Sequence, residues 1–150
     1  MNYKETIENR IPEMARDYTE DWDGYGSKPA SKIAIDRAIE ILKKLEKYNI
    51  DCPSIYAISN GDVEMLWVWY GHNKKDRKRW TLTLTVSENS IDDQGDCLFF
   101  EFNAKEGIES YMKDFDKQKE SFYLYFNHED DLPEGMINKL NELEEWKKLN

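Results

Sequence analysis

The acidic, glycine-rich segment Asp21–Pro29 is the first place where residue types and spacing could support chemistry. Aspartate oxygens bind calcium, and an EF-hand loop has glycine at its sixth position and acidic ligands at its first and twelfth. With Gly24 in the sixth position, those two ends fall on Thr19 and Ala30, which cannot supply the ligands. The spacing therefore excludes an EF-hand. Turn formation and helix capping explain these aspartates more simply than a looser metal site does.

The same segment also carries Gly24-x-Gly26 followed by Lys28, which has the look of a phosphate-binding loop. A phosphate loop follows a strand and ends in Gly-Lys-Ser or Gly-Lys-Thr. Neither feature is present in the sequence, so we do not expect nucleotide binding, and no cofactor is predicted.

The histidines and cysteines do not form a recognisable catalytic or metal-binding pattern. His72 and His128 both fall in expected loops, which favours solvated side chains over a triad or a zinc site. Cys52 and Cys97 show no Cys-x-x-Cys spacing, and we expect both to be buried as small apolar residues. A pair of carboxylates acting as acid and base stays open, because nothing singles out one pair. No catalytic residue and no metal ligand is predicted, and the sequence leans away from an enzyme.

The charge distribution points to a different kind of interaction. The net charge is −10, with acidic clusters at Asp17–Asp23, Asp92–Asp96 and Glu129–Glu134. Nucleic-acid binding needs a basic footprint, so direct contact with nucleic acid is not expected. The clusters are either dispersed and solvated, or they converge and present carboxylates as nucleic acid presents phosphates. The one basic run, Lys74–Arg79, is best interpreted as a charged hairpin tip. Taken alone it could also contact nucleic acid or an acidic partner, or pair with the acidic patches in a homodimer.

No apolar stretch approaches the length of a membrane span, and Met1–Glu5 does not resemble a signal peptide. We therefore expect a cytoplasmic protein with no membrane partner.

The segment Asp21-Trp22-Asp23-Gly24-Tyr25-Gly26-Ser27-Lys28-Pro29, with Pro53 and Asn60–Trp67 further along, resembles a set of small bacterial proteins. These uncharacterised proteins carry an Asn/Asp-Trp-Asp-Gly-x-Gly-Ala-x-Pro signature and are often encoded on mobile elements. The resemblance covers residues 20–86, with Ser27 in place of the alanine. It implies an accessory or host-interaction protein, and it carries no established reaction.

The elements that must position these residues follow from periodicity. The run Val63–Tyr70 is apolar on both faces, and Trp80–Val86 alternates apolar residues with threonines, which predicts two strands of an antiparallel hairpin. Further strands are predicted at 54–58, 97–102 and 121–126. A helix is predicted at 4–20, which either starts near Ile11 with Pro12 in its first turn or breaks there. Further helices are predicted at Ser31–Tyr48 with Ser31 as N-cap, at 104–115, and from Asp131 onward.

Residues 1–150 are therefore expected to form one α+β domain, an antiparallel sheet of four or five strands packed by the N-terminal helix, the Ser31–Tyr48 helix and the C-terminal helix. The leading hypothesis is a non-enzymatic acidic protein-binding module that occupies a basic surface on a partner protein. Its specific form is a phage or mobile-element inhibitor of a basic, nucleic-acid-binding host protein. The candidate binding residues are the loop and the acidic surface: Asp21, Trp22, Asp23, Tyr25, Asp92, Asp93, Asp96, Glu129, Asp130 and Asp131.

Two alternatives stay open. One is a small-ligand-binding protein or enzyme in which Asp21, Asp23, Tyr25 and Trp67 converge near the Trp22–Tyr25 loop. The other is a homo-oligomeric accessory protein that assembles through sheet edges or the C-terminal helix.

Overall fold

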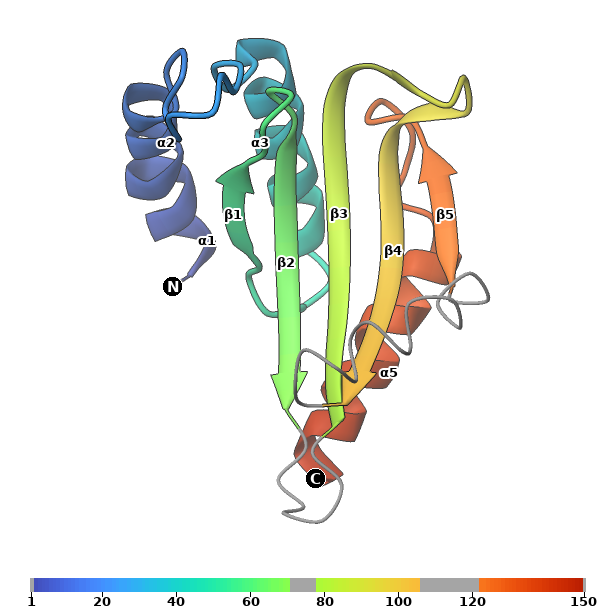
Figure 1. The fold of residues 1–150 in the computed structure, drawn as a ribbon. Helices are drawn as coiled ribbons and strands as arrows, with labels where there is room; N and C mark the ends of the chain where they lie inside the picture. Colours follow the sequence, from blue (N-terminus) through green and yellow to red (C-terminus); the bar gives the residue numbers. More distant parts are fainter. Residues whose placement is uncertain (1, 71–77, 106–121, 150) are drawn as a thin grey trace.

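A five-stranded antiparallel sheet forms the centre of the computed structural model, which describes residues 2–70, 78–105 and 122–149 (Figure 1). The strands lie in sequence order, so each one pairs with its neighbour along the chain. Their bounds are β1 Ser54–Ala57, β2 Val63–Tyr70, β3 Lys78–Ile91, β4 Gly95–Lys105 and β5 Tyr123–Phe126. The predicted α+β class with an antiparallel sheet of four or five strands is confirmed.

Helices cover one face of this sheet. Figure 1 shows α3 (Lys32–Glu46) and α5 (Glu134–Leu149) behind the strands. The N-terminal helical segment lies beside the β1 edge and comprises α1 (Tyr3–Glu5), the π-helix η1 (Thr6–Arg10) and α2 (Ile11–Asp17). The Ser31 hydroxyl accepts a hydrogen bond from Ala34 N at 3.1 Å, so the predicted N-cap is confirmed.

The π-helix explains how the N-terminal segment accommodates Pro12. Proline has no N–H to donate, and its ring clashes with the carbonyl four residues earlier in an α-helix. The chain responds by widening the turn before it, where Ile11 N donates to Thr6 O, and α2 then begins with the proline in its first turn. Of the two predicted alternatives, a start near Ile11 with the proline in the first turn describes α2, and the helical segment also extends before it as α1 and η1.

The core lies between the sheet and the helices that cover it. Inward-facing strand residues alternate along the sequence, among them Val63, Met65, Trp67, Leu82, Leu84, Val86 and Phe99. The α3 stripe of Ala34, Ala38, Ile41, Leu42 and Leu45 packs against them, with Met136 and Leu140 of α5. A buried ion pair also ties α5 to the sheet, because Lys139 Nζ lies 2.7 Å from Glu101 Oε2 on β4.

Two predicted boundaries are wrong. The strands expected at Trp80–Val86 and 97–102 approach each other more closely than predicted, because β3 continues to Ile91 and β4 already begins at Gly95. The helix expected at 104–115 does not begin at Ala104, which is still part of β4, while residues 106–115 lie outside the described part of the chain. Both errors arise where a strand becomes polar and loses its alternating pattern. Across the described ranges, no helix has the length and apolar character needed to cross a membrane.

Candidate functional site

The Asp21–Pro29 loop is held together by its own aspartates. Asp21 Oδ1 accepts from Gly26 N at 2.7 Å, and Asp23 Oδ1 accepts from Tyr25 N at 2.9 Å. The Ser27 hydroxyl donates to the other oxygen of Asp23. The Ser27 bond and then the Tyr25 backbone bond lower the pKa of Asp23. These carboxylates are therefore turn-forming groups, as the turn interpretation predicts.

The two aromatic residues of the loop have opposite roles. Trp22 fastens the loop, since its ring packs edge-on against Tyr18 at 4.8 Å and its Nε1 donates to Lys28 O. Tyr25 projects away from the body and is 92% exposed. The loop thus presents one bare aromatic side chain on a rigid frame.

The structure does not bring Trp67 to this loop. Trp67 is 3% exposed, its Nε1 donates to Asp51 O at 2.9 Å, and its ring packs against Phe99 in the core. Asp21 and Asp23 are used within the loop and Tyr25 points into solvent. The predicted concavity built from these four side chains is absent, so a ligand site of that composition is not formed.

The two later acidic clusters do lie together. The β3–β4 turn carries Asp92 and Asp93, and the β5–α5 connection carries Glu129, Asp130 and Asp131. Tyr125 OH on β5 donates to Asp92 Oδ2 at 3.4 Å, and the ring of His128 contacts Asp96 directly after the turn, so both segments meet at the end of β5. We call the exposed side chains of Asp92, Asp93, Glu129, Asp130 and Asp131 the acidic rim.

The first acidic cluster lies further along the same end of the sheet (Figure 1). Its loop is fastened to the β1–β2 turn, where Lys28 N donates to Ser59 O and Ser31 N donates to Gly61 O. The Ser31 hydroxyl also reaches Glu88 on β3 at 3.2 Å. Asp21 and Asp23 therefore share an end of the molecule with the acidic rim without forming part of it.

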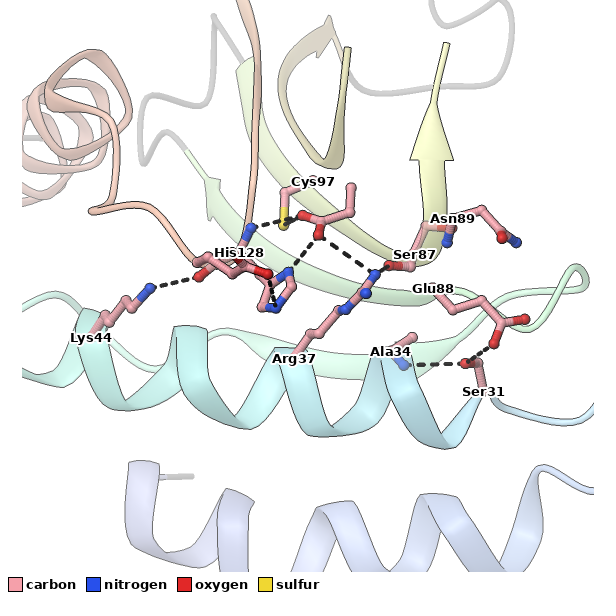
Figure 2. A network of polar contacts seen from close by, with 11 residues as sticks. Ser31, Ala34, Arg37, Lys44, Ser87, Glu88, Asn89, Cys97 and His128 are labelled. Carbon is pink, nitrogen blue, oxygen red and sulfur yellow. Dashed lines mark hydrogen bonds and ion pairs between the residues drawn. The ribbon is translucent and has the colours of Figure 1, made fainter. Parts of the chain in front are cut away.

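Asp96 is different from its acidic neighbours, and its predicted place on the acidic surface is wrong. It is 8% exposed, and its carboxylate contacts Arg37, Cys97 and His128, which Figure 2 shows gathered above α3. One carboxylate oxygen accepts from His128 N at 2.7 Å and from the Cys97 thiol at 3.2 Å. The other contacts His128 Nδ1 and lies 3.5 Å from Arg37 Nη1. A carboxylate this enclosed has to be satisfied from inside the protein.

Helix α3 supplies the basic side of this network. Arg37 also donates to Ser87 O at 2.7 Å, while Lys44 Nζ donates to His128 O at 2.6 Å and to Asp130 O at 2.9 Å (Figure 2). Arg37 and Lys44 are seven residues apart and therefore share one flank of the helix. The network fastens the β5–α5 connection and the β3–β4 hairpin to α3.

The Asp96–His128 pair has the arrangement of the orienting half of a triad, and among the described residues no nucleophile lies next to it. A triad needs a hydroxyl or thiol on the other imidazole nitrogen. In the part of the chain that the structure describes, His128 Nε2 faces Glu129 Oε1 at 3.9 Å. Cys97 bonds to the aspartate instead, and burial, followed by the hydrogen bond to Asp96, raises its thiol pKa far above the ordinary range. Cys97 is buried, as expected, and the network joins the segments that its members come from.

A small cavity of about 270 Å³ lies between the π-helix and β1, lined by Thr6, Arg10, Cys52, Pro53, Ser54, Ile55 and Tyr56. This is near the lower limit of about 300 Å³ for ligand pockets. Its polar groups bind one another or nearby residues: Thr6 Oγ1 lies 3.3 Å from Cys52 Sγ, and Tyr56 OH donates to Glu64. Burial raises the pKa of the Cys52 thiol, which disfavours the reactive thiolate form. Cys52 is half-buried rather than fully buried as predicted.

Among residues 2–70, 78–105 and 122–149, no three histidine, cysteine, aspartate or glutamate side chains gather as a metal site would require. His72 and Lys74–Arg77 lie outside those ranges. No known protein-family model, curated protein or solved structure matches this chain.

The Asp96–His128 network is the feature that sequence reasoning missed. Its members come from α3, β4 and the β5–α5 connection, and His128 lies 32 residues after Asp96. The sequence contains one indication of this network. Arg37 and Lys44 lie at the border of the apolar α3 stripe, and a charge that is partly buried there needs an acidic or carbonyl partner.

Proposed function

We propose that this chain is a non-enzymatic protein-binding module whose acidic rim docks onto a basic surface of a partner protein. One observation carries the proposal. None of the acidic-rim carboxylates is paired with a lysine or arginine of the described residues, although Arg37 and Lys44 lie beside them. Arg37 pairs with Asp96 and both cations bind backbone carbonyls. Within the described residues the negative charge of the acidic rim is therefore not neutralised, and it can attract a basic partner.

The side chains at the same end of the molecule support an enzyme less well than they support a binding module. The Asp96–His128 pair has no nucleophile among the described residues, and the loop aspartates are used as turn formers. The more specific form of the proposal is an inhibitor that imitates nucleic acid on a host protein. It rests on the likeness of Asp21–Pro29 to proteins of mobile elements and on the net charge of −10.

The test compares two variants with equal changes in net charge. The rim variant carries Asp92→Asn, Asp93→Asn, Glu129→Gln, Asp130→Asn and Asp131→Asn. The control neutralises the same number of exposed carboxylates on the helices, with Glu8→Gln, Asp36→Asn, Glu40→Gln, Glu46→Gln and Glu142→Gln. Each protein is immobilised, bacterial lysate is passed over it, and bound proteins are quantified by mass spectrometry at low and at high salt.

We expect wild type and control to retain the same basic proteins, with release at high salt, and the rim variant to lose them. The proposal is overturned if the control loses those proteins as fully as the rim variant does, or if no retained protein is salt-sensitive.

A further inference from the structure

The two edges of the sheet differ in which described elements lie beside them. At the β1 edge the N-terminal helical segment lies alongside (Figure 1). Arg10 Nε in this segment donates to the outward carbonyl of Ile55 at 3.1 Å. At the β5 edge no helix or strand of the described residues lies beside the chain. An edge strand without a cover is a ready template for another strand.

The pairing register shows which backbone groups of β5 are free. Glu101 N donates to Phe122 O at 2.9 Å, so Phe122 and the alternate residues Leu124 and Phe126 direct their backbone groups toward β4. Tyr123 and Tyr125 therefore direct theirs outward. In the described part of the chain, no group bonds to the N–H or C=O of either tyrosine. These groups offer donors and acceptors at the spacing of an extended strand.

The side chains on β5 favour pairing and carry no device against it. The strand reads Tyr-Leu-Tyr-Phe, without the proline, bulge or charge that usually protects an edge. Tyr123 is 55% exposed and its ring packs edge-on against Tyr125 at 6.0 Å. Tyr125 in turn donates to Asp92, which places the acidic rim at the end of this edge.

We propose that the partner protein contributes an extended, lysine- or arginine-bearing segment that adds to the sheet as a strand along β5. Main-chain bonds to Tyr123 and Tyr125 supply the pairing, as in other strand-addition complexes. Basic side chains of the same segment reach Asp92, Asp93 and Glu129. The inference deepens the proposed function, since it rests on a basic partner and adds how that partner is held.

Electrostatic attraction favours a basic segment of a partner, rather than a second copy of the chain, as the strand that pairs with β5. A second copy brings another net charge of −10, which opposes association, whereas a basic segment is steered toward the rim. Self-pairing through β5 is accordingly one of the outcomes that would overturn the inference.

Two substitutions at one position separate the backbone from the side chain. Both Tyr125→Pro and Tyr125→Thr remove the ring and the bond to Asp92. Only the proline removes an outward N–H, and it leaves every ladder bond to β4 in place because that N–H does not face β4. Tyr125→Thr keeps the backbone N–H and introduces a β-branched residue that favours the strand conformation, so it is the matched control.

The probe is the peptide acetyl-Lys-Val-Lys-Val-Lys-Val-amide, with its glutamate counterpart as the charge control. Amide hydrogen exchange is followed by NMR. The lysine peptide should slow exchange at Tyr123 and Tyr125, and the glutamate peptide should not. Tyr125→Pro should bind the lysine peptide about tenfold more weakly than Tyr125→Thr, the loss expected for about one backbone bond. Equal binding by the two variants, or no protection at these two amides, overturns the inference.

The same measurements distinguish this inference from the proposed function. If the lysine peptide shifts only acidic-rim resonances, the edge inference fails and the acidic docking surface stands. If the rim variant protects Tyr123 and Tyr125 as wild type does, the edge stands as a strand-binding site and the acidic docking surface fails. A third outcome is that the amides of Tyr123 and Tyr125 are protected from exchange without peptide, increasingly at higher protein concentration, and that light scattering shows a dimer. That result assigns the edge to a second copy of the chain and overturns the inference.

Discussion

Asp96 is the residue on which the acidic end of the molecule depends. Asp92 and Asp93 of the same acidic cluster are exposed, while Asp96 accepts hydrogen bonds from His128 and Cys97 and lies beside Arg37. Burial alone would raise its pKa. The hydrogen bonds from His128 and Cys97 outweigh burial and hold the pKa of this carboxyl below its ordinary value. The ionised form is therefore the one that the fold requires.

Asp96→Asn should destabilise the protein by about 2–4 kcal/mol, because the amide leaves Arg37 and His128 without their charged partner. Urea denaturation at neutral pH measures this free energy of unfolding. The control is Asp93→Asn, an exposed position with φ of 57° that asparagine also tolerates, and it should stay within about 0.5 kcal/mol of wild type. A cost at Asp96 no larger than that of the control contradicts the fastening role.

The depressed pKa also predicts the pH dependence of that difference. Because the folded state holds Asp96 ionised below the pKa of the unfolded chain, the unfolded state binds the proton first as pH falls. The advantage of wild type over Asp96→Asn should be complete above about pH 5 and shrink progressively below about pH 4. A difference that stays constant down to about pH 3 would show that Asp96 titrates as an ordinary carboxyl.

At the scale of elements, the sequence predicts best where one face of a strand or helix is buried. The strand Val63–Tyr70 and the cap at Ser31 follow from apolar runs and from hydrogen-bonding chemistry local to the chain. The sequence did not predict that β3 continues through Ser87–Ile91, because both faces of this segment are polar. The partnership of Asp96 with His128 was missed because only the folded sheet brings them together.

The loop and the β1–β2 turn meet at Gly61, and that contact fixes where the Asp21–Pro29 loop lies. A Cβ on Gly61 would lie 2.8 Å from Pro29 O, and the residue has φ of +90°. Gly61→Ala should cost about 2–3 kcal/mol, since steric overlap adds to the backbone strain. Gly24→Ala is the matched control, because φ is +77° and nothing lies within 4 Å of its Cβ.

We expect Gly24→Ala to cost about 1 kcal/mol, the strain alone. Thermal or urea unfolding of both variants measures the difference. Equal costs at the two glycines would mean that the loop moves aside freely, and the rigid frame described for Tyr25 would then be wrong.

At the scale of the whole molecule, gathered negative charge should weaken the folded state at low ionic strength. Raising sodium chloride from about 0.02 M to about 0.2 M shortens the screening length and should stabilise wild type by on the order of 1 kcal/mol at pH 7. The rim variant should gain less than the helix control, although their net charges are equal. An equal gain in both variants would mean that the rim carboxylates repel one another no more than scattered ones do.

The strand order β1-β2-β3-β4-β5 also bears on how the chain folds as it leaves the ribosome. Each new strand finds its pairing partner already made, so closure distances stay short and folding should be fast for a sheet protein. Among the described strands β5 is the last to arrive, and none of them pairs with its outer edge. The edge proposed to bind a partner is thus the edge of the described sheet that forms last. A bound segment would lie where a sixth strand could pair with β5.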